Sequence, residues 1–177
     1  STGRIRAFLD ACVLYPPRLR GLLLGLADRG LFDPAWSAGV VAEWAHLLAA
    51  RDPAGAAALP ERLALMAAPW PDGPAPPGDP AALSLPDPND AHVLAAAIAG
   101  GAQVLLTLNL RDFPARVLAA HGLTARHPDA FALDLWLTHP APVRAVVADI
   151  WPGLPGPDLR RALRKADLPR LGKALSS

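Results

Sequence analysis

Short apolar runs alternate with helical segments along most of this 177-residue chain, and this alternation limits the possible folds more than any other feature. The runs cover residues 4–9, 31–36, 104–108 and 123–126. Runs of this length that are mostly apolar are typical of strands buried on both faces. Such strands, separated by helices, predict an α/β fold of three layers, in which helices flank a central parallel sheet.

The predicted helices have recognisable first residues. Proline at the first helical position and Ser or Asp at the cap mark where each one begins. The helices are predicted to begin near Pro16, Ser37, Asp52, Pro88 and Phe113. Residues 69–80 are rich in Pro and Gly and are predicted to form a loop. Beyond His127 the chain is expected to be entirely helical, as a C-terminal helical extension.

Charge is distributed unevenly along the chain. The whole chain carries a net charge of +1, but residues 156–177 carry +4 and residues 1–155 carry −3. We therefore divide the chain into a domain at residues 1–150 and a segment at residues 151–177, a Pro/Gly linker followed by a basic helical tail. Two interpretations of the tail stay open: a solvated amphipathic helix, or a surface that holds an anionic ligand.

The cysteine content and the hydropathy of the chain indicate the cellular compartment in which it folds. The single cysteine, Cys12, rules out an internal disulfide and favours a reducing cytosol. The longest apolar run, residues 94–108, contains Gln103 and a Gly-Gly break and is too short to cross a bilayer. We therefore expect a soluble, cytoplasmic protein without a membrane partner.

Acidic residues lie where the predicted strands end. Asp10 directly follows the first strand, and Asp112 lies in the loop after the third. Asp90 falls in the first turn of the helix that precedes that third strand. Ligands of open parallel sheets bind at the carboxyl ends of the strands, so these acids are expected to converge. Glu43 lies on an otherwise apolar helix and is expected to face water or cations.

Three segments resemble motifs of the PIN-domain family. They are Arg6-Ala-Phe-Leu-Asp-Ala-Cys-Val-Leu14, Pro86-Asp-Pro-Asn-Asp-Ala-His-Val-Leu-Ala-Ala-Ala97 and Leu106-Thr-Leu-Asn-Leu-Arg-Asp-Phe113. They keep the order of the family's motifs, span about residues 4–133, and most resemble the VapC-like branch of toxin ribonucleases. The resemblance implies an acidic quartet of catalytic metal ligands: Asp10, Glu43, Asp90 and Asp112.

The resemblance also implies roles for two polar residues of the third motif. Thr107 would orient a carboxylate, and Asn109 would contact a metal-bound water or a phosphate. The fourth acid of the family varies in position, so Asn109 and Asp112 remain alternatives as the direct ligand.

By the same resemblance, the chain is expected to be a metal-dependent endoribonuclease. The implied cofactor is Mg²⁺ or Mn²⁺, because hard divalent cations prefer oxygen ligands. The implied partners are an RNA substrate, a cognate antitoxin and a second copy of the chain in a homodimer. Cations of the tail would hold RNA phosphates: Arg160, Arg161, Arg164 and Lys165.

Two rival functions remain. One is a non-catalytic PIN-type module that binds RNA or protein, and the other is a phosphatase of another α/β family. A haloacid-dehalogenase-type phosphatase would need a second Asp two residues after Asp10, where this chain has Cys12. Structural roles also compete at single positions: Asp87 and Asp112 can cap helices, and His92 can be a surface or partner-facing side chain.

Overall fold

The central sheet has four parallel strands in the order β2-β1-β3-β4, as described by a computed structural model that covers residues 3–177. The strands are β1 (Arg6–Leu9), β2 (Asp33–Ala35), β3 (Val104–Leu106) and β4 (Thr124–Arg126). Each of them falls within one of the four apolar runs. The predicted three-layer α/β fold with a parallel sheet is therefore confirmed.

Helices make up most of the remaining chain. Those of four or more residues are α1 (Ala11–Leu14), α2 (Pro17–Asp28), α3 (Ala38–Arg51), α4 (Pro53–Ala67), α5 (Ala91–Ala99), α6 (Ala115–Ala119), α7 (Pro128–Thr138), α8 (Pro140–Ile150), α9 (Gly156–Lys165) and α10 (Pro169–Leu175). Three short 3₁₀ helices are η1 (Pro80–Ala82), η2 (Pro88–Asp90) and η3 (Leu110–Asp112). The predicted helices are confirmed, whereas α1 was not predicted.

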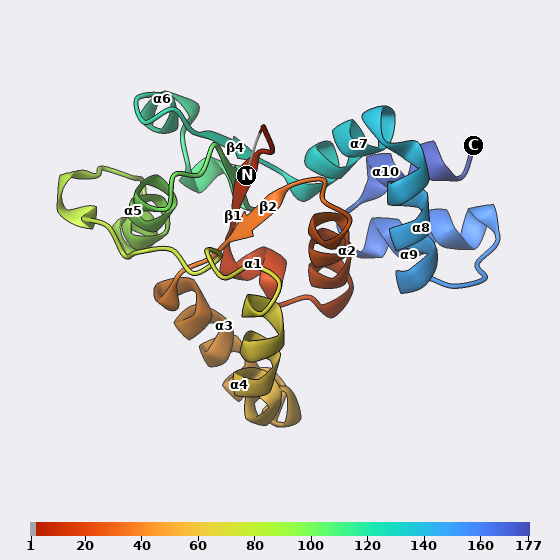
Figure 1. Cartoon of the computed structure of the whole chain (residues 1–177), viewed down its shortest axis with the longest axis horizontal. Helices are drawn as coiled ribbons and strands as arrows, with labels where there is room; N and C mark the ends of the chain where they lie inside the picture. Colours follow the sequence, from red (N-terminus) through yellow and green to blue (C-terminus); the bar gives the residue numbers. More distant parts are fainter. Residues whose placement is uncertain (1–2) are drawn as a thin grey trace.

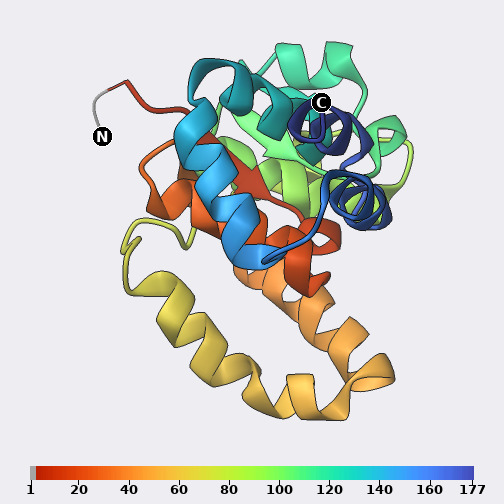
Figure 2. The ribbon, with the colours of Figure 1, turned by 90° about the vertical axis from the view of Figure 1, so that its right-hand side faces the viewer.

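The order of the strands decides which helices cover which face. The step from β1 to β2 runs in one direction across the sheet, and the steps to β3 and β4 run in the other. Because crossovers are right-handed, α2 lies on one face and α5 and α6 lie on the opposite face. Helices α7–α10 join α2 on its side, and α3 and α4 form a hairpin that projects from the rest of the molecule (Figure 1, Figure 2).

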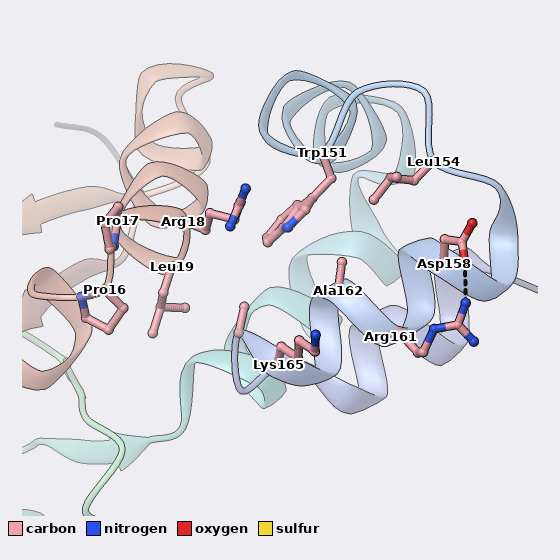
Figure 3. A pocket seen from close by; sticks show the side chains of 11 residues that line it. Pro16, Pro17, Arg18, Leu19, Trp151, Leu154, Asp158, Arg161, Ala162 and Lys165 are labelled. Atoms are coloured by element: carbon pink, nitrogen blue, oxygen red, sulfur yellow. Dashed lines mark hydrogen bonds and ion pairs between the residues drawn. The ribbon is translucent and has the colours of Figure 1, made fainter.

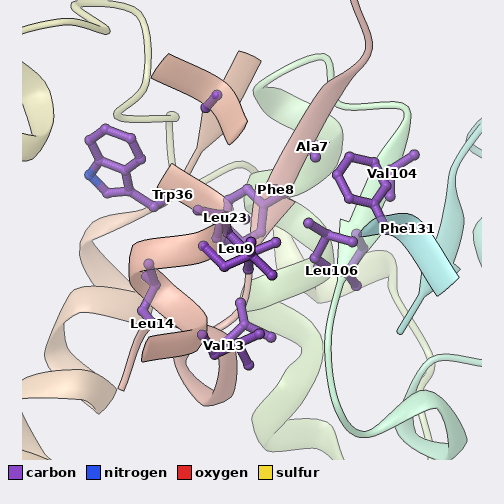
Figure 4. Close-up of a cluster of buried hydrophobic side chains, with 14 of the residues drawn as sticks. Ala7, Phe8, Leu9, Val13, Leu14, Leu23, Trp36, Val104, Leu106 and Phe131 are labelled. Carbon is purple, nitrogen blue, oxygen red and sulfur yellow. The ribbon is translucent and has the colours of Figure 1, made fainter. Parts of the chain in front are cut away.

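The core forms around the two central strands. Phe8, Leu9 and Leu106 are fully buried and pack with Val13 and Phe131 (Figure 4). Each large apolar side chain buried in this way contributes roughly 1.5–3 kcal/mol. No helix within residues 3–177 is long and apolar enough to span a membrane.

The C-terminal helices share this core. Their inward-facing side chains are buried: Leu163, Leu168, Leu171 and Leu175. Asp129 of α7, only 4% exposed, accepts hydrogen bonds from the backbone N–H groups of Arg170 and Leu171, both at 2.9 Å. These are the first turn of α10, so a carboxylate 41 residues earlier caps that helix. The boundary between residues 1–150 and 151–177 stays a prediction.

Candidate active site

Asp10 lies at the carboxyl end of β1 and is held in a fixed position. Its backbone N–H donates to the Leu106 carbonyl oxygen of β3 (3.1 Å). Its Oδ1 accepts from the N–H of Ala11 (2.8 Å), and its Oδ2 accepts from the Thr107 hydroxyl (2.9 Å). Asp10 is 7% exposed. It therefore ends the strand and caps α1, and Thr107 fixes the direction of its carboxylate.

Two further groups complete the hydrogen bonding around Asp10. The Thr107 hydroxyl accepts from the Asn109 backbone N–H (3.1 Å). The Cys12 thiol donates to Asp10 Oδ2 (3.5 Å) and accepts from the Leu108 N–H (3.3 Å). Burial, followed by the charge of Asp10, raises the pKa of the Cys12 thiol to about 12. The thiol is therefore protonated at neutral pH, and its contact with Asp10 was not predicted from the sequence.

Asp90 is the acid whose charge is most affected by its surroundings. It ends η2 and precedes α5, and its side chain caps neither helix. Partial burial raises its pKa to about 6, with further contributions from Asp112, Asp87, Asp10 and Glu43 in that order. All three of the other candidate ligands are therefore close enough for their charges to act on Asp90.

Among the neighbouring polar residues, some cap a helix, and others cap none and are available to bind a ligand. Asp87 accepts a hydrogen bond from the Asn89 N–H (2.9 Å) and caps η2, which is the role expected for it. Helix α6 follows Pro114 without a side-chain cap, so Asp112 does not cap it. Asp112 and the exposed Asn109 thus stay available at the edge of the sheet.

Glu43 on α3 pairs with His92 on α5. The side chains are 44% and 35% exposed, so solvent reaches the pair. Gly39 lies one turn before Glu43 and makes room for the imidazole, because a Cβ there would lie 2.6 Å from His92 Nδ1. From the sequence, His92 was expected to be a surface or partner-facing side chain, and its contact with Glu43 was not predicted. In the sequence, the feature that goes with this contact is Gly39, four residues before Glu43.

These side chains suit a hard divalent cation, because carboxylate oxygens predominate among them. Within residues 3–177, no three His, Cys, Asp or Glu side chains lie close enough to enclose a metal ion by themselves. Mg²⁺ keeps several waters and uses one or two carboxylates together with substrate phosphates, so an open arrangement fits this ion. A cation would also offset the negative charges that, after partial burial, raise the pKa of Asp90.

The cations of α9 border different hollows. Arg161 forms an ion pair with Asp158 and, with Lys165, lines a hollow beside the start of α2 (Figure 3). Arg164 lines a second hollow next to α7, and Arg160 lines neither of the two. Arg161 and Lys165 thus border one hollow, and Arg164 borders another.

Fold and site together define the class of protein: a three-layer α/β protein with carboxylates gathered at the carboxyl edge of its parallel sheet. The sequence profile of the PIN domain matches residues 6–111, which include Asp10, Glu43 and Asp90. This match covers more than half of the chain and ends one residue before Asp112. The chain belongs to the PIN-domain family.

One relative supports the VapC-like branch of that family. Over 58 residues the chain is 41% identical to the protein named "Putative ribonuclease VapC50" of Mycobacterium tuberculosis. The matched segment is 33% of this chain and 34% of that protein, so the chain covers about a third of the relative's length. No solved structure matches the chain.

Proposed function

We propose that this protein is a divalent-metal-dependent endoribonuclease and the toxin of a VapC-like toxin–antitoxin pair. The observation that carries the proposal is the position of the acids around the carboxyl end of β1, where partial burial of Asp90, followed by the charges of Asp112, Asp87, Asp10 and Glu43, raises the pKa of Asp90 to about 6. Carboxylates that repel one another destabilise a fold, so their concentration at one edge favours a role in binding cations. Membership of the PIN family and the name of the relative support ribonuclease activity.

In the proposed mechanism four acids would hold Mg²⁺ or Mn²⁺: Asp10, Glu43, Asp90 and Asp112. When bound, the ion supplies activation of water and stabilisation of the leaving oxygen. The hydroxyl of Thr107 keeps the Asp10 carboxylate oriented (2.9 Å), and the exposed Asn109 would contact a phosphate. The protonated Cys12 thiol is a poor nucleophile, in keeping with hydrolysis without a covalent protein intermediate.

The proposed partners follow from the same assignment. The substrate is RNA, and the tail contributes cations that contact its phosphates: Arg160, Arg161, Arg164 and Lys165. A cognate antitoxin would cover the acidic edge of the sheet, and the chain would act as a homodimer in the cytoplasm.

Cleavage of single-stranded RNA by purified protein, with and without Mg²⁺, tests this function. Asp90→Asn keeps the shape of the side chain and removes its charge, so we expect cleavage to fall by orders of magnitude while the fold persists. Asp87→Asn is the matched control and retains activity, because Asp87 caps η2. Equal cleavage by wild type and Asp90→Asn would place the activity elsewhere.

Metal binding is a separate test of the same site. A cation that binds only the folded state raises the melting temperature. Mn²⁺ should therefore stabilise the wild type and have a much smaller effect on Asp10→Asn. Identical metal affinities for the two proteins would remove Asp10 from the ligand set.

A second candidate is the non-catalytic PIN-type module. It is favoured by the open spacing of the acids, since no three potential ligands within residues 3–177 enclose a metal site. Such a module would bind RNA without cleaving it at any Mg²⁺ or Mn²⁺ concentration. Membership of the PIN family removes the phosphatase of another α/β family from the candidates.

A further inference from the structure

Helix α1 has only four residues, and side chains from other parts of the fold hold it at both ends. A helix this short is unstable by itself, because its first turn fixes several residues for one hydrogen bond. At its start, Asp10 Oδ1 accepts a hydrogen bond from the Ala11 N–H (2.8 Å). At its end, Nη1 of Arg20 donates to the carbonyl oxygens of Leu14 (2.7 Å) and Tyr15 (3.3 Å). The direction of α1, and of the carboxylate that caps it, therefore depends on a guanidinium from α2.

The same guanidinium also contacts α3, which packs on α1 together with α2 (Figure 1). Its central carbon lies 5.0 Å from the centroid of the Trp44 ring, within the range of a cation–π interaction. Trp44 is fully buried, and its indole Nε1 has no hydrogen-bond partner within residues 3–177. The ring is therefore held by packing and by the cation. Because Glu43 precedes Trp44 on α3, Arg20 joins the helix that Asp10 caps to the helix that carries Glu43.

Arg20 carries its charge in an environment that disfavours it. The residue is 8% exposed and forms no ion pair with any other residue in the described range 3–177. Burial, followed by the charge of Arg62, lowers the pKa of Arg20 to about 10, so the side chain is still charged at neutral pH. Apolar replacements of buried charged groups are often neutral or stabilising. Stability alone therefore does not account for an arginine at this position.

The shape of the guanidinium does account for it. The group is planar, so its edge can donate hydrogen bonds while its face lies on an aromatic ring. Arg20 makes both contacts at once, with the end of α1 and with the Trp44 ring. A lysine could donate a hydrogen bond but has no flat face, and an apolar side chain could do neither.

We propose that Arg20 is a positioning residue, which fixes α1 to α3 and so holds the Asp10 and Glu43 carboxylates in the relative positions that a divalent cation needs. This inference rests on the proposed metal-dependent function and adds to it a residue that touches neither metal nor RNA. Mg²⁺ demands near-ideal geometry, with oxygen ligands at about 2.0–2.1 Å, so a small displacement of one ligand weakens binding. Residues that support metal ligands in this way typically change metal affinity by about 10–100-fold.

The test compares the affinity for Mn²⁺ alone, measured by isothermal titration calorimetry on the full chain without denaturant. Arg20→Met removes the charge and the donors but keeps an unbranched apolar stem. We expect this variant to bind Mn²⁺ at least about tenfold more weakly than the wild type. Its urea midpoint should change little, because the unfavourable burial of a charge is removed together with the contacts. Arg20→Lys, which keeps a donor without the flat face, should bind with intermediate affinity.

Two further variants separate positioning from a purely structural role. Leu163→Ala opens a cavity in the core below α9, a helix that packs mainly on α10. It should lower the urea midpoint more than Arg20→Met does and leave the Mn²⁺ affinity unchanged. Trp44→Leu removes the ring on which Arg20 lies. If Arg20 acts through this ring, the double variant Arg20→Met/Trp44→Leu loses no more affinity than the more affected of the two single variants.

Wild-type Mn²⁺ affinity in Arg20→Met overturns the inference, as does an equal loss of affinity in Leu163→Ala or additive losses in the double variant. Should Arg20→Met not fold, Arg20→Lys carries the test, and wild-type affinity in that variant overturns the inference. Unchanged binding in the Arg20 variants would leave the proposed function intact and remove only the role of Arg20. Absence of Mn²⁺ binding by the wild type would instead contradict the proposed function, and the inference would fall with it.

Discussion

The imidazole of His92 lies against the carboxylate of Glu43 and beside Gly39, so that α5 and α3 are joined by a pair that contains a candidate metal ligand. Only Oε1 of Glu43 takes part in this contact. Cation binding at Glu43 therefore competes with His92 or uses the second carboxylate oxygen.

We predict that this pair stabilises the metal-free protein only slightly. A double-mutant cycle of His92→Ala and Glu43→Gln, followed by urea unfolding, should give a coupling of about 0.2–1 kcal/mol, as is usual for exposed pairs. Saturating Mg²⁺ should reduce this coupling, because the metal draws the carboxylate away. A coupling that is unchanged by Mg²⁺, with unaltered metal affinity of Glu43→Gln, would exclude Glu43 as a ligand.

The raised pKa of Asp90 predicts how metal affinity depends on pH. A ligand must lose its proton to bind metal, and the pKa of Asp90 is about 6 rather than 3.8. Affinity for Mn²⁺ should therefore rise up to about tenfold per pH unit below pH 6 and level off above it. Isothermal titration calorimetry between pH 5 and pH 8, in the range given by the shift of Asp90, measures this. In Asp90→Asn this rise should be absent; a matching rise in that variant would contradict the prediction.

The same shift predicts the pH dependence of stability without metal. The folded state favours the protonated Asp90, so it binds more protons than the unfolded state between pH 3.8 and about 6. The contribution of Asp90 to stability is thus present below pH 3.8 and is lost as the pH rises through about 6. Asp90→Asn should melt at a higher temperature than the wild type at pH 7 in EDTA, and the difference should shrink towards pH 4. A lower melting temperature for Asp90→Asn at pH 7 would show that repulsion does not dominate.

Removal of the Thr107 hydroxyl should affect both stability and metal binding. Thr107→Val leaves Asp10 Oδ2 without its 2.9 Å donor and the Asn109 N–H without its acceptor. We expect a loss of about 1–3 kcal/mol in the free energy of unfolding and at least a tenfold loss of metal affinity. Thr107→Ser keeps the hydroxyl and should retain most of the affinity. If Thr107→Val binds Mn²⁺ as tightly as wild type does, the orientation of Asp10 does not matter for binding.

The contact between Asp129 and α10 should be a major anchor of the C-terminal helices. Asp129→Ala removes two charge-assisted hydrogen bonds to buried or half-buried N–H groups, so we expect a loss of about 2–4 kcal/mol. Asp134→Ala on the same helix is the control. Asp134 pairs with Arg126 at the surface, and its loss should cost less than about 1 kcal/mol. Equal urea midpoints for the two variants would contradict the anchoring role.

The alternation of strands and helices could be predicted because the strands are apolar on both faces and Pro, Gly and Ser mark the helix ends. Helix α1 could not, since its four residues are too few to show a periodic pattern. Asp10 and Asp90 stand out through their motifs and their positions relative to strands. The pairing of Glu43 with His92 joins residues 49 positions apart and depends on how α3 packs on α5, which local sequence does not record.

The basic tail, too, could be predicted only in part from the sequence. An amphipathic helix was predicted there, and Leu163 is buried on α9. The direction in which each cation points depends on where α9 lies against α2 and α8. The sequence therefore could not predict that Arg161 and Lys165 border one hollow and Arg164 another.

The capping of α10 by Asp129 also bears on the order of events on the ribosome. A chain that has emerged only as far as α9 has the sheet, the acids and most of the core, but the Asp129 carboxylate still lacks its two backbone donors. Until Leu171 has left the exit tunnel, α10 cannot pack over Asp129, and the carboxylate keeps its contact with water instead of its two backbone donors. The side of α7 that carries Asp129 is therefore expected to stay exposed to solvent and to proteases until α10 is synthesised.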